Sequence, residues 1–287
     1  MNRFRSLLLP LDGSPEAAKA AGCALWLAER LGATLHVLHA TAQPLPGQEA
    51  LERLRLPSAG RAQVVLHQLA GSAETAVLDA VREHRVELVV MSASGESASA
   101  GAALGEGLGS VARAVIGASP VPVVLLPVRY RETLPWRTML AAASGEPAAD
   151  RALEAAAQLA AALALRVDVM HSGDVPAGAG IYADAPHHEH GRQLQEMVER
   201  GLAGCTAEES RCVQEVLLRH GDPAVAMLDH VARKGTGLLA LGWHGALGGG
   251  RAPVLKRLLE EAPCALLLVR APETSSARLK VGEEIDG

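Results

Sequence analysis

The chain has 287 residues, a formal net charge of −5 and 49% hydrophobic residues. This apolar content excludes a disordered chain, and the length favours two domains that each bury a core. The acidic balance, without a long basic run, argues against nucleic acid as a partner, because such affinity comes largely from phosphate neutralisation. With one Phe, two Tyr and three Trp, the chain also offers few platforms for stacking bases.

The four cysteines contain no CxxC pair and no zinc-ligand spacing, which favours buried thiols in a reducing compartment. Near the N-terminus, the apolar run Leu7–Leu9 ends at Pro10 and Asp12. That run is too short for a signal peptide or a membrane span. We therefore expect a cytoplasmic protein with no membrane partner.

In the first half, short apolar runs alternate with helical patterns. We expect strands near 6–11, 34–39, 63–69, 87–92 and 121–128, and helices near 15–31, 48–55, 72–84 and 109–117. Ser14 is the expected N-cap of the first helix, with Pro15 at its first position, and Gly32 ends it. Ser14 is thus interpreted as a cap and not as a nucleophile.

The second half repeats this alternation. We expect strands near 137–142, 166–171, 213–219, 237–242 and 264–269, and helices near 148–163, 189–203, 223–234 and 253–261. Strands such as 88–91 and 238–241 are apolar throughout, which is typical of a parallel sheet covered on both faces. The order predicts an α/β fold with right-handed crossovers and a doubly wound sheet.

Three segments of the first half recur in the same order in the second half. The matched pairs are 11–20 with 143–152, 71–95 with 221–245, and 119–126 with 262–269. Strand-turn-helix punctuation common to any two α/β domains is the alternative, but shared Gly and Pro positions favour duplication. The polar segment 129–136 marks the boundary, which predicts domains at 1–131 and 132–272 and a mobile tail at 273–287.

A ligand of such a sheet binds outside the carboxyl ends of the strands. Asp12 follows the first predicted strand, and Ser92 to Gly95 end the fourth. Gly109 and Ser110 open the next helix, whose first N–H groups are suited to a phosphate.

The informative segments are Leu-Asp-Gly-Ser at 11–14, the turn at 92–95, and Gly-Ser before a Val-Ala-Arg-Ala-Val helix and a Pro-Val strand. These segments resemble the universal stress protein family. The resemblance covers 4–128 and 137–270. It implies two tandem, doubly wound, five-stranded parallel-sheet domains of the Rossmann-like, adenine nucleotide alpha hydrolase-like class. It also implies dimer-like packing of the repeats within one chain, and it leaves a homodimer of two chains open.

The resemblance further implies an adenine nucleotide such as ATP, with Mg²⁺, in a pocket where glycine backbone wraps the phosphates. The residues it assigns to that pocket are Asp12, Gly13, Ser92, Gly95, Gly109 and Ser110 in the first domain, and Gly242, His244 and Gly245 in the second.

Neither copy keeps the whole family pattern. In the first, Ser92 replaces a glycine, and the spacer after Gly95 has thirteen residues in place of nine, with Glu96 and Glu106 but no Lys or Arg. Carboxylates there repel phosphates unless they bind a metal or point away. The notable change in the second copy is Ser144 at the position of Asp12.

The second copy also shortens its spacer to six residues and has Ala252-Pro253 in place of Gly-Ser. Its nearby Arg251, Lys256 and Arg257 are suited to attract an anion. We expect nucleotide mainly in the first domain and interpret Gly242 and Gly245 as inherited turn residues.

The sequence is compatible with three functions. The first is a non-catalytic, nucleotide-responsive stress protein; the second is a nucleotide-free scaffold or protein-interaction module. The third, a slow nucleotide hydrolase, lacks a visible base, nucleophile or pair of metal-binding carboxylates.

The remaining histidines carry less information. His187, His188, Glu189 and His190 lie in an expected loop, where a solvated segment is favoured over a zinc or nickel site. His36 and His39 lie on one predicted strand at odd separation, so they face opposite sides of the sheet.

Overall fold

The computed structural model of the chain describes residues 3–95, 108–131, 133–172, 186–245, 247 and 252–271. The side chains of 62 and 186–191 lie outside that description. So do the predicted tail 273–287 and the residues Glu96, Glu106 and Arg251 noted above.

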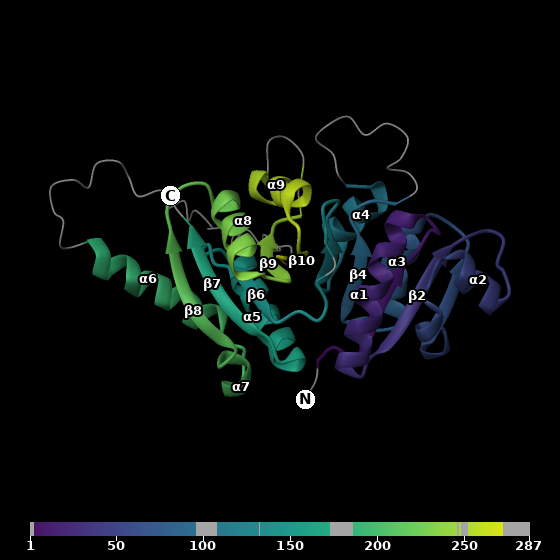
Figure 1. The fold of residues 1–287 in the computed structure, drawn as a ribbon, viewed down its shortest axis with the longest axis horizontal. Coiled ribbons are helices and arrows are strands. Elements are labelled where there is room, and N and C mark those ends of the chain that lie inside the picture. The colour runs from purple at the N-terminus through teal and green to yellow at the C-terminus, as the bar shows by residue number, and fades with distance from the viewer. Residues whose placement is uncertain are drawn as a thin grey trace, which may run out of the picture.

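The two repeats have the same succession of elements, except that the short helix before the third strand is a 3-10 helix in the first repeat and an α-helix in the second (Figure 1). The first contains β1 (Ser6–Pro10), α1 (Pro15–Leu31), β2 (Thr34–Ala40), α2 (Gly47–Arg53), η1 (Ser58–Gln63), β3 (Val64–Leu69), α3 (Ala73–Glu83), β4 (Leu88–Ser92), α4 (Ser110–Ala118) and β5 (Val123–Leu126). The second contains β6 (Thr138–Ala142), α5 (Pro147–Leu163), β7 (Arg166–Ser172), α6 (Pro186–Gly201), α7 (Ala207–Ser210), β8 (Val213–Arg219), α8 (Pro223–Lys234), β9 (Leu238–Trp243), α9 (Pro253–Glu261) and β10 (Ala265–Arg270).

The strands form one ten-stranded sheet in the order β3-β2-β1-β4-β5-β10-β9-β6-β7-β8. Within each repeat all neighbours are parallel, which confirms the predicted doubly wound, five-stranded sheets. The repeats join where β5 and β10 pair antiparallel, with Leu125 opposite Leu266 and Val123 opposite Leu268. The two sheets are therefore continuous through their backbone hydrogen bonds.

Helices cover both faces of this sheet (Figure 1). One core layer lies under α1, α2, α5 and α6, and the other lies under α3, α4, α8 and α9. Each layer contains residues of both repeats, so the hydrophobic core also crosses the junction. Trp136, in the segment between β5 and β6, packs edge to face on Trp26 of α1, with ring centroids 5.1 Å apart.

The predicted signals at the ends of α1 are confirmed. Ser14 Oγ accepts the Ala17 N–H, and Gly32 ends the helix at a left-handed φ of 61°. Within the described part of the chain, no helix combines the length and the apolar character that crossing a bilayer requires. The four cysteines, all of them described, form no disulfide.

Two expected elements are corrected. The strand expected at 121–128 spans only Val123–Leu126, because Pro122 and Pro127 flank it and proline cannot donate to the sheet. The segment 187–190, expected in a loop, belongs to α6, which starts at Pro186, a residue suited to the first helical position. The side chains of residues 187–190 lie outside the description.

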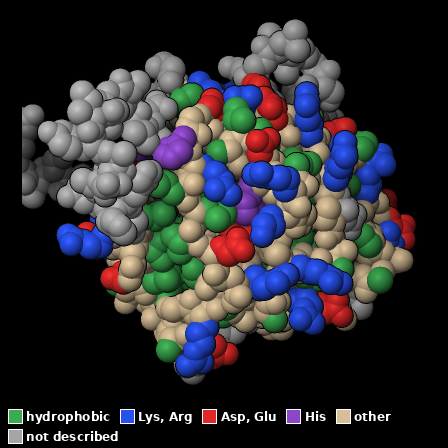
Figure 2. Space-filling view, turned by 60° about the vertical axis from the view of Figure 1, so that its left-hand side comes forward, with side chains coloured by type: hydrophobic (Ala, Val, Ile, Leu, Met, Phe, Trp, Pro, Cys, Tyr) green, Lys and Arg blue, Asp and Glu red, His purple; other side chains and the backbone are tan. Residues whose placement is uncertain are grey.

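Surface charge is mixed on the side of the molecule where the second repeat lies. Figure 2 shows Lys and Arg side chains among Asp and Glu side chains over this face. The interspersed signs agree with the small net charge of −5.

Candidate functional site

A cleft opens at the carboxyl ends of the strands in the first repeat. It contains about 630 Å³ of space between atoms, including its open mouth. The predicted residues that line it are Asp12, Ser92, Gly95 and Gly109. Apolar walls come from Leu38, Val77, Met91, Val111 and Ala112.

Asp12 fixes the turn between β1 and α1 at the floor of this cleft. Its Oδ1 accepts the Ser14 N–H at 2.9 Å, and the cap of α1 follows directly. Gly13 adopts φ +86°, a conformation that side chains other than glycine's rarely allow. The Gly13 carbonyl accepts a hydrogen bond from Arg55 Nε at 3.0 Å.

Gly95 lies against the Asp12 carboxylate. A methyl group at position 95 would overlap Asp12 Oδ2, so this position requires glycine while Asp12 keeps its place. Since the residue lines the cleft, its backbone is available to a ligand. The glycine predicted at position 95 thus lies where the backbone comes close to the Asp12 carboxylate.

Gly109 and Ser110 differ in what they offer to a ligand. Gly109 caps α4, and its N–H donates to the Ala93 carbonyl at 2.8 Å. Ser110 Oγ donates to Glu74 Oε1 at 3.0 Å, at the start of α3. The hydrogen bonds from the Glu74 N–H and from the Ser110 hydroxyl hold the pKa of Glu74 below its usual range. A carboxylate thus stands beside the helix end that was predicted to bind phosphate.

His39 is a cleft residue that the sequence analysis did not assign. Its Nδ1 donates to the Leu11 carbonyl, 3.0 Å away, and its ring lines the cleft. The second repeat repeats the contact, with His171 Nδ1 at 2.7 Å from the Ala143 carbonyl. Each pair is 28 residues apart, a spacing that a comparison of the two halves could have revealed.

A second basin adjoins the cleft and shares Asp12 and His39 with it. Gly13 lines this basin, together with Thr41 and the exposed Arg53. The basin adds about 1180 Å³ of space, which includes open solvent. Asp12 and His39 therefore lie between two compartments, one walled by apolar side chains and one lined by polar and charged residues of both signs, including Glu16 and Arg53.

The glycines of the second repeat are explained by packing. A methyl group on Gly242 would overlap the backbone of Ala148 and Ala149, so the glycine lets β9 approach α5. Gly245, at φ +84°, lies against Gly117 of α4 and the side chain of Arg270, at the contact between repeats. His244 between them is exposed.

The other predicted features of the second repeat are weaker than in the first. Ser144 Oγ accepts the Glu146 N–H at 3.4 Å, a longer version of the bond that Asp12 makes. Arg257, expected to attract an anion, instead contacts Asp222 at 3.2 Å and Glu261 at 3.0 Å. Those two carboxylates already neutralise it.

Comparison with known proteins agrees with the fold. A universal stress protein from Archaeoglobus fulgidus superposes with a TM-score of 0.61 at 16% identity, covering 93% of this chain and 98% of that one. One from Pseudomonas aeruginosa gives the same TM-score and identity and covers 93% of each chain. A family member from Arabidopsis thaliana with AMP bound covers 48% of this chain and 93% of its own, at 16% identity and a TM-score of 0.35.

These likenesses concern the fold alone, and the AMP is a property of the Arabidopsis protein. A search of curated proteins found no match. The sequence model of the universal stress protein family matches residues 3–58, 40–127 and 135–270, which covers both repeats. The chain belongs to the universal stress protein family and carries its domain in tandem.

Proposed function

We propose that the protein binds an adenine nucleotide in the cleft of the first repeat, while the second repeat serves as a structural partner. The observation that carries the proposal is the close packing of Gly95 on Asp12 at the floor of an open cleft. It puts bare backbone and a carboxylate side by side, at the strand ends where α/β sheets bind ligands.

The nucleoside part fits the cleft. Val77, Met91 and Val111 provide apolar walls for a flat base. Asp12 accepts hydrogen bonds and is suited to ribose hydroxyls or to the amino group of adenine. His39, fixed through Nδ1, lines the same space.

The phosphate groups of the nucleotide fit the cleft less well than the nucleoside does. The N-terminus of α4 directs N–H groups outward and favours negative charge, but Glu74 opposes that charge. Mg²⁺, when bound with the nucleotide, supplies positive charge that offsets the carboxylate. Arg53 on the basin rim is a second source of positive charge.

We propose binding without turnover, in the cytoplasm. Asp12 is held by the Ser14 N–H, and the hydroxyl of this site that is hydrogen-bonded to a carboxylate, Ser110 on Glu74, lies outside the residues that line the cleft. The nucleotide would then act by changing which conformation or partner is favoured.

Equilibrium dialysis with ATP and Mg²⁺ tests the proposal, with Ser144→Ala as the matched control for Asp12→Ala. We expect saturable binding of one nucleotide by the wild type and by Ser144→Ala, and loss of binding in Asp12→Ala. Equal affinity in all three proteins, or negligible binding by the wild type, overturns the assignment.

The scaffold remains the second candidate because of one observation, the Glu74 carboxylate at the start of α4. It is favoured if the purified wild type neither retains nor takes up nucleotide. Release of ADP that Asp12→Ala abolishes would instead support the hydrolase.

A further inference from the structure

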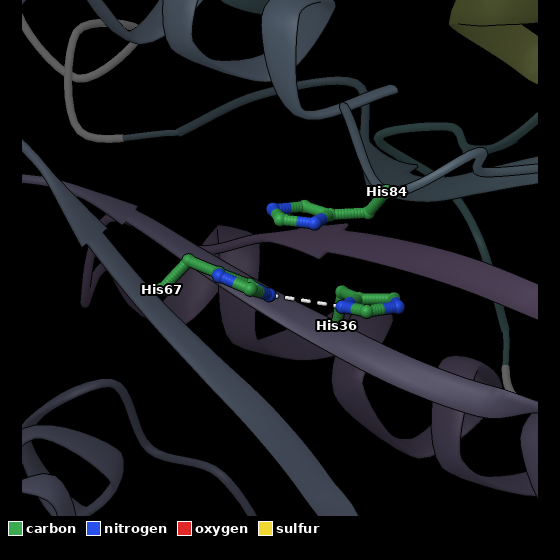
Figure 3. Close-up of side chains that lie close together, drawn as sticks. All are labelled: His36, His67 and His84. Atoms are coloured by element: carbon green, nitrogen blue, oxygen red, sulfur yellow. Dashed lines mark hydrogen bonds between the residues drawn. The ribbon is translucent and has the colours of Figure 1, made fainter. Parts of the chain in front are cut away.

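Three histidines from three different elements meet at the other end of the first repeat. His36 lies in β2, His67 in β3, and His84 caps the C-terminus of α3. One ring nitrogen from each lies within 4.8 Å of the others (Figure 3). Helix α3 runs back against the strands, so its C-terminus lies far from the nucleotide cleft at the strand ends.

The rings are already in mutual contact. His36 Nδ1 and His67 Nε2 are 2.9 Å apart, so one nitrogen donates to the lone pair of the other. The His84 ring stacks on both, with centroids 4.1 Å from His67 and 5.0 Å from His36. All three side chains are half-buried, which leaves a path to solvent.

The environment keeps imidazole lone pairs available. Burial, followed by repulsion from the neighbouring imidazoles, holds the pKa of His36 and of His67 below the usual value. These effects favour the neutral imidazole, which is the form that binds metals. Nearby Glu83 favours positive charge at His67, and a cation at this place would benefit from the same field.

We propose that His36, His67 and His84 form a binding site for a divalent transition-metal cation such as Zn²⁺, Ni²⁺, Cu²⁺ or Co²⁺. Imidazole suits these metals, and three histidines with one open position is a known zinc ligand set. When the cation binds, the ring that donates in the His36–His67 contact changes tautomer: its proton moves through solvent to its other nitrogen, so both rings stay neutral and each offers a lone pair. Water takes the fourth position.

Small ring movements complete the site. Two nitrogens on a tetrahedral zinc lie about 3.3 Å apart at the usual bond length, so the gap between His36 and His67 widens by a few tenths of an ångström. His84 turns about its last side-chain torsion, which has a broad minimum, to direct a nitrogen inward. Its backbone stays fixed, because its carbonyl accepts a hydrogen bond from Ser6 Oγ at 3.1 Å.

The second repeat has its own side-chain partners for a carboxylate at the equivalent place. Asp168 occupies the strand position of His36, since Leu140 pairs with Asp168 as Leu8 pairs with His36. Asp168 contacts His230 at 3.1 Å, and Lys234 contacts the neighbouring Glu215 at 3.5 Å. Asp168 is thus already occupied by a side chain there, whereas the equivalent place in the first repeat holds three imidazoles in contact with one another.

Titration of the full chain with Co²⁺ and then Zn²⁺, without nucleotide, tests this site. We expect one Co²⁺ with the visible absorption of a tetrahedral nitrogen-ligated ion, displaced by Zn²⁺. His67→Gln and His84→Asn should each weaken binding by more than about 100-fold, because changes outside the ligand shell alone cost about 10- to 100-fold. Circular dichroism checks that both variants fold. His84→Asn should fold, because His84 stands at the C-cap of α3, where Asn is also tolerated.

The control variant combines His187→Gln, His188→Gln and His190→Gln, which removes the other histidine cluster of the sequence. It should keep the full affinity and spectrum. The site is overturned if the wild type binds no Co²⁺, if binding is unchanged in both ligand variants, or if the control variant alone loses it. None of these outcomes bears on nucleotide binding.

Discussion

His230 and Asp168 meet in the interior of the second repeat, with Nε2 and Oδ2 3.1 Å apart and side chains 3% and 10% exposed. The N–H is not well aligned on the oxygen, so the contact is an electrostatic one more than a good hydrogen bond. Burial lowers the pKa of His230, although Asp168 opposes this change. The pair fixes α8 on β7.

Removal of one partner should therefore be costly. His230→Ala leaves a buried carboxylate without compensation, and we expect it to lower the free energy of unfolding by about 3–5 kcal/mol. The double variant Asp168→Leu/His230→Leu should recover most of this loss. Urea unfolding measures both, and a double variant that is no more stable than His230→Ala contradicts the interpretation.

Gly95→Val should close the cleft while the rest of the fold remains intact. The new side chain overlaps the Asp12 carboxylate, so we expect nucleotide affinity to fall at least tenfold, measured by calorimetry. Gly47→Ala is the control, because a methyl group there meets nothing within 4 Å and lies outside the cleft. Wild-type affinity in Gly95→Val would show that the ligand binds elsewhere.

Gly242→Ala tests the packing role of the second-repeat turn. Its methyl group meets backbone atoms of α5, which cannot rotate away, and overpacking of this kind costs about 1–3 kcal/mol. Thermal unfolding should show the loss. Ser92→Ala, at the equivalent place in the first repeat, should change stability by less than about 0.5 kcal/mol. Equal effects of the two substitutions would refute the packing argument.

Glu74→Gln should raise the affinity for ATP, by about threefold to tenfold, since it removes a charge close to the start of α4. The gain should shrink at high salt. Asp79→Asn, on the same helix but near its middle, is the control. A lower affinity in Glu74→Gln would mean that this carboxylate helps to hold the ligand.

The pH dependence has a defined sign. Because the pKa of Glu74 is lowered, the carboxylate stays charged below the range where an ordinary Glu takes up a proton. Its repulsion is complete at pH 7 and is lost only as the pH falls through the lowered value. The difference in ATP affinity between wild type and Glu74→Gln should therefore persist through the range where an ordinary Glu is protonated, and a difference already lost in that range would contradict this.

The sequence predicted what local rules govern. Ser14 and Gly32 bound α1 through caps that need only neighbouring residues, and the order of elements determined the fold class. It also separated His36 from His39 correctly: His39 contacts the Leu11 carbonyl, whereas His36 contacts His67. Period-two alternation along a strand is enough for that distinction.

Contacts between distant elements were not predictable. His67 meets His36 only because β3 pairs with β2 in a register that puts His67 opposite Leu38. Likewise, the pairing of Arg257 with Asp222 depends on how α9 lies on α8. The antiparallel pairing of β5 with β10 could not be predicted from the sequence of either strand, because both strands are apolar and buried like their neighbours.

The β5–β10 pairing also determines what happens if the repeats are separated. Cutting between residues 127 and 137 would strip each half of a neighbour and bare a row of unsatisfied amides on strands made of Val and Leu. Such an edge recruits other strands. An isolated half would therefore tend to pair with a second copy of itself or to aggregate. Joining the two repeats in one chain keeps each of these edge strands covered by the other.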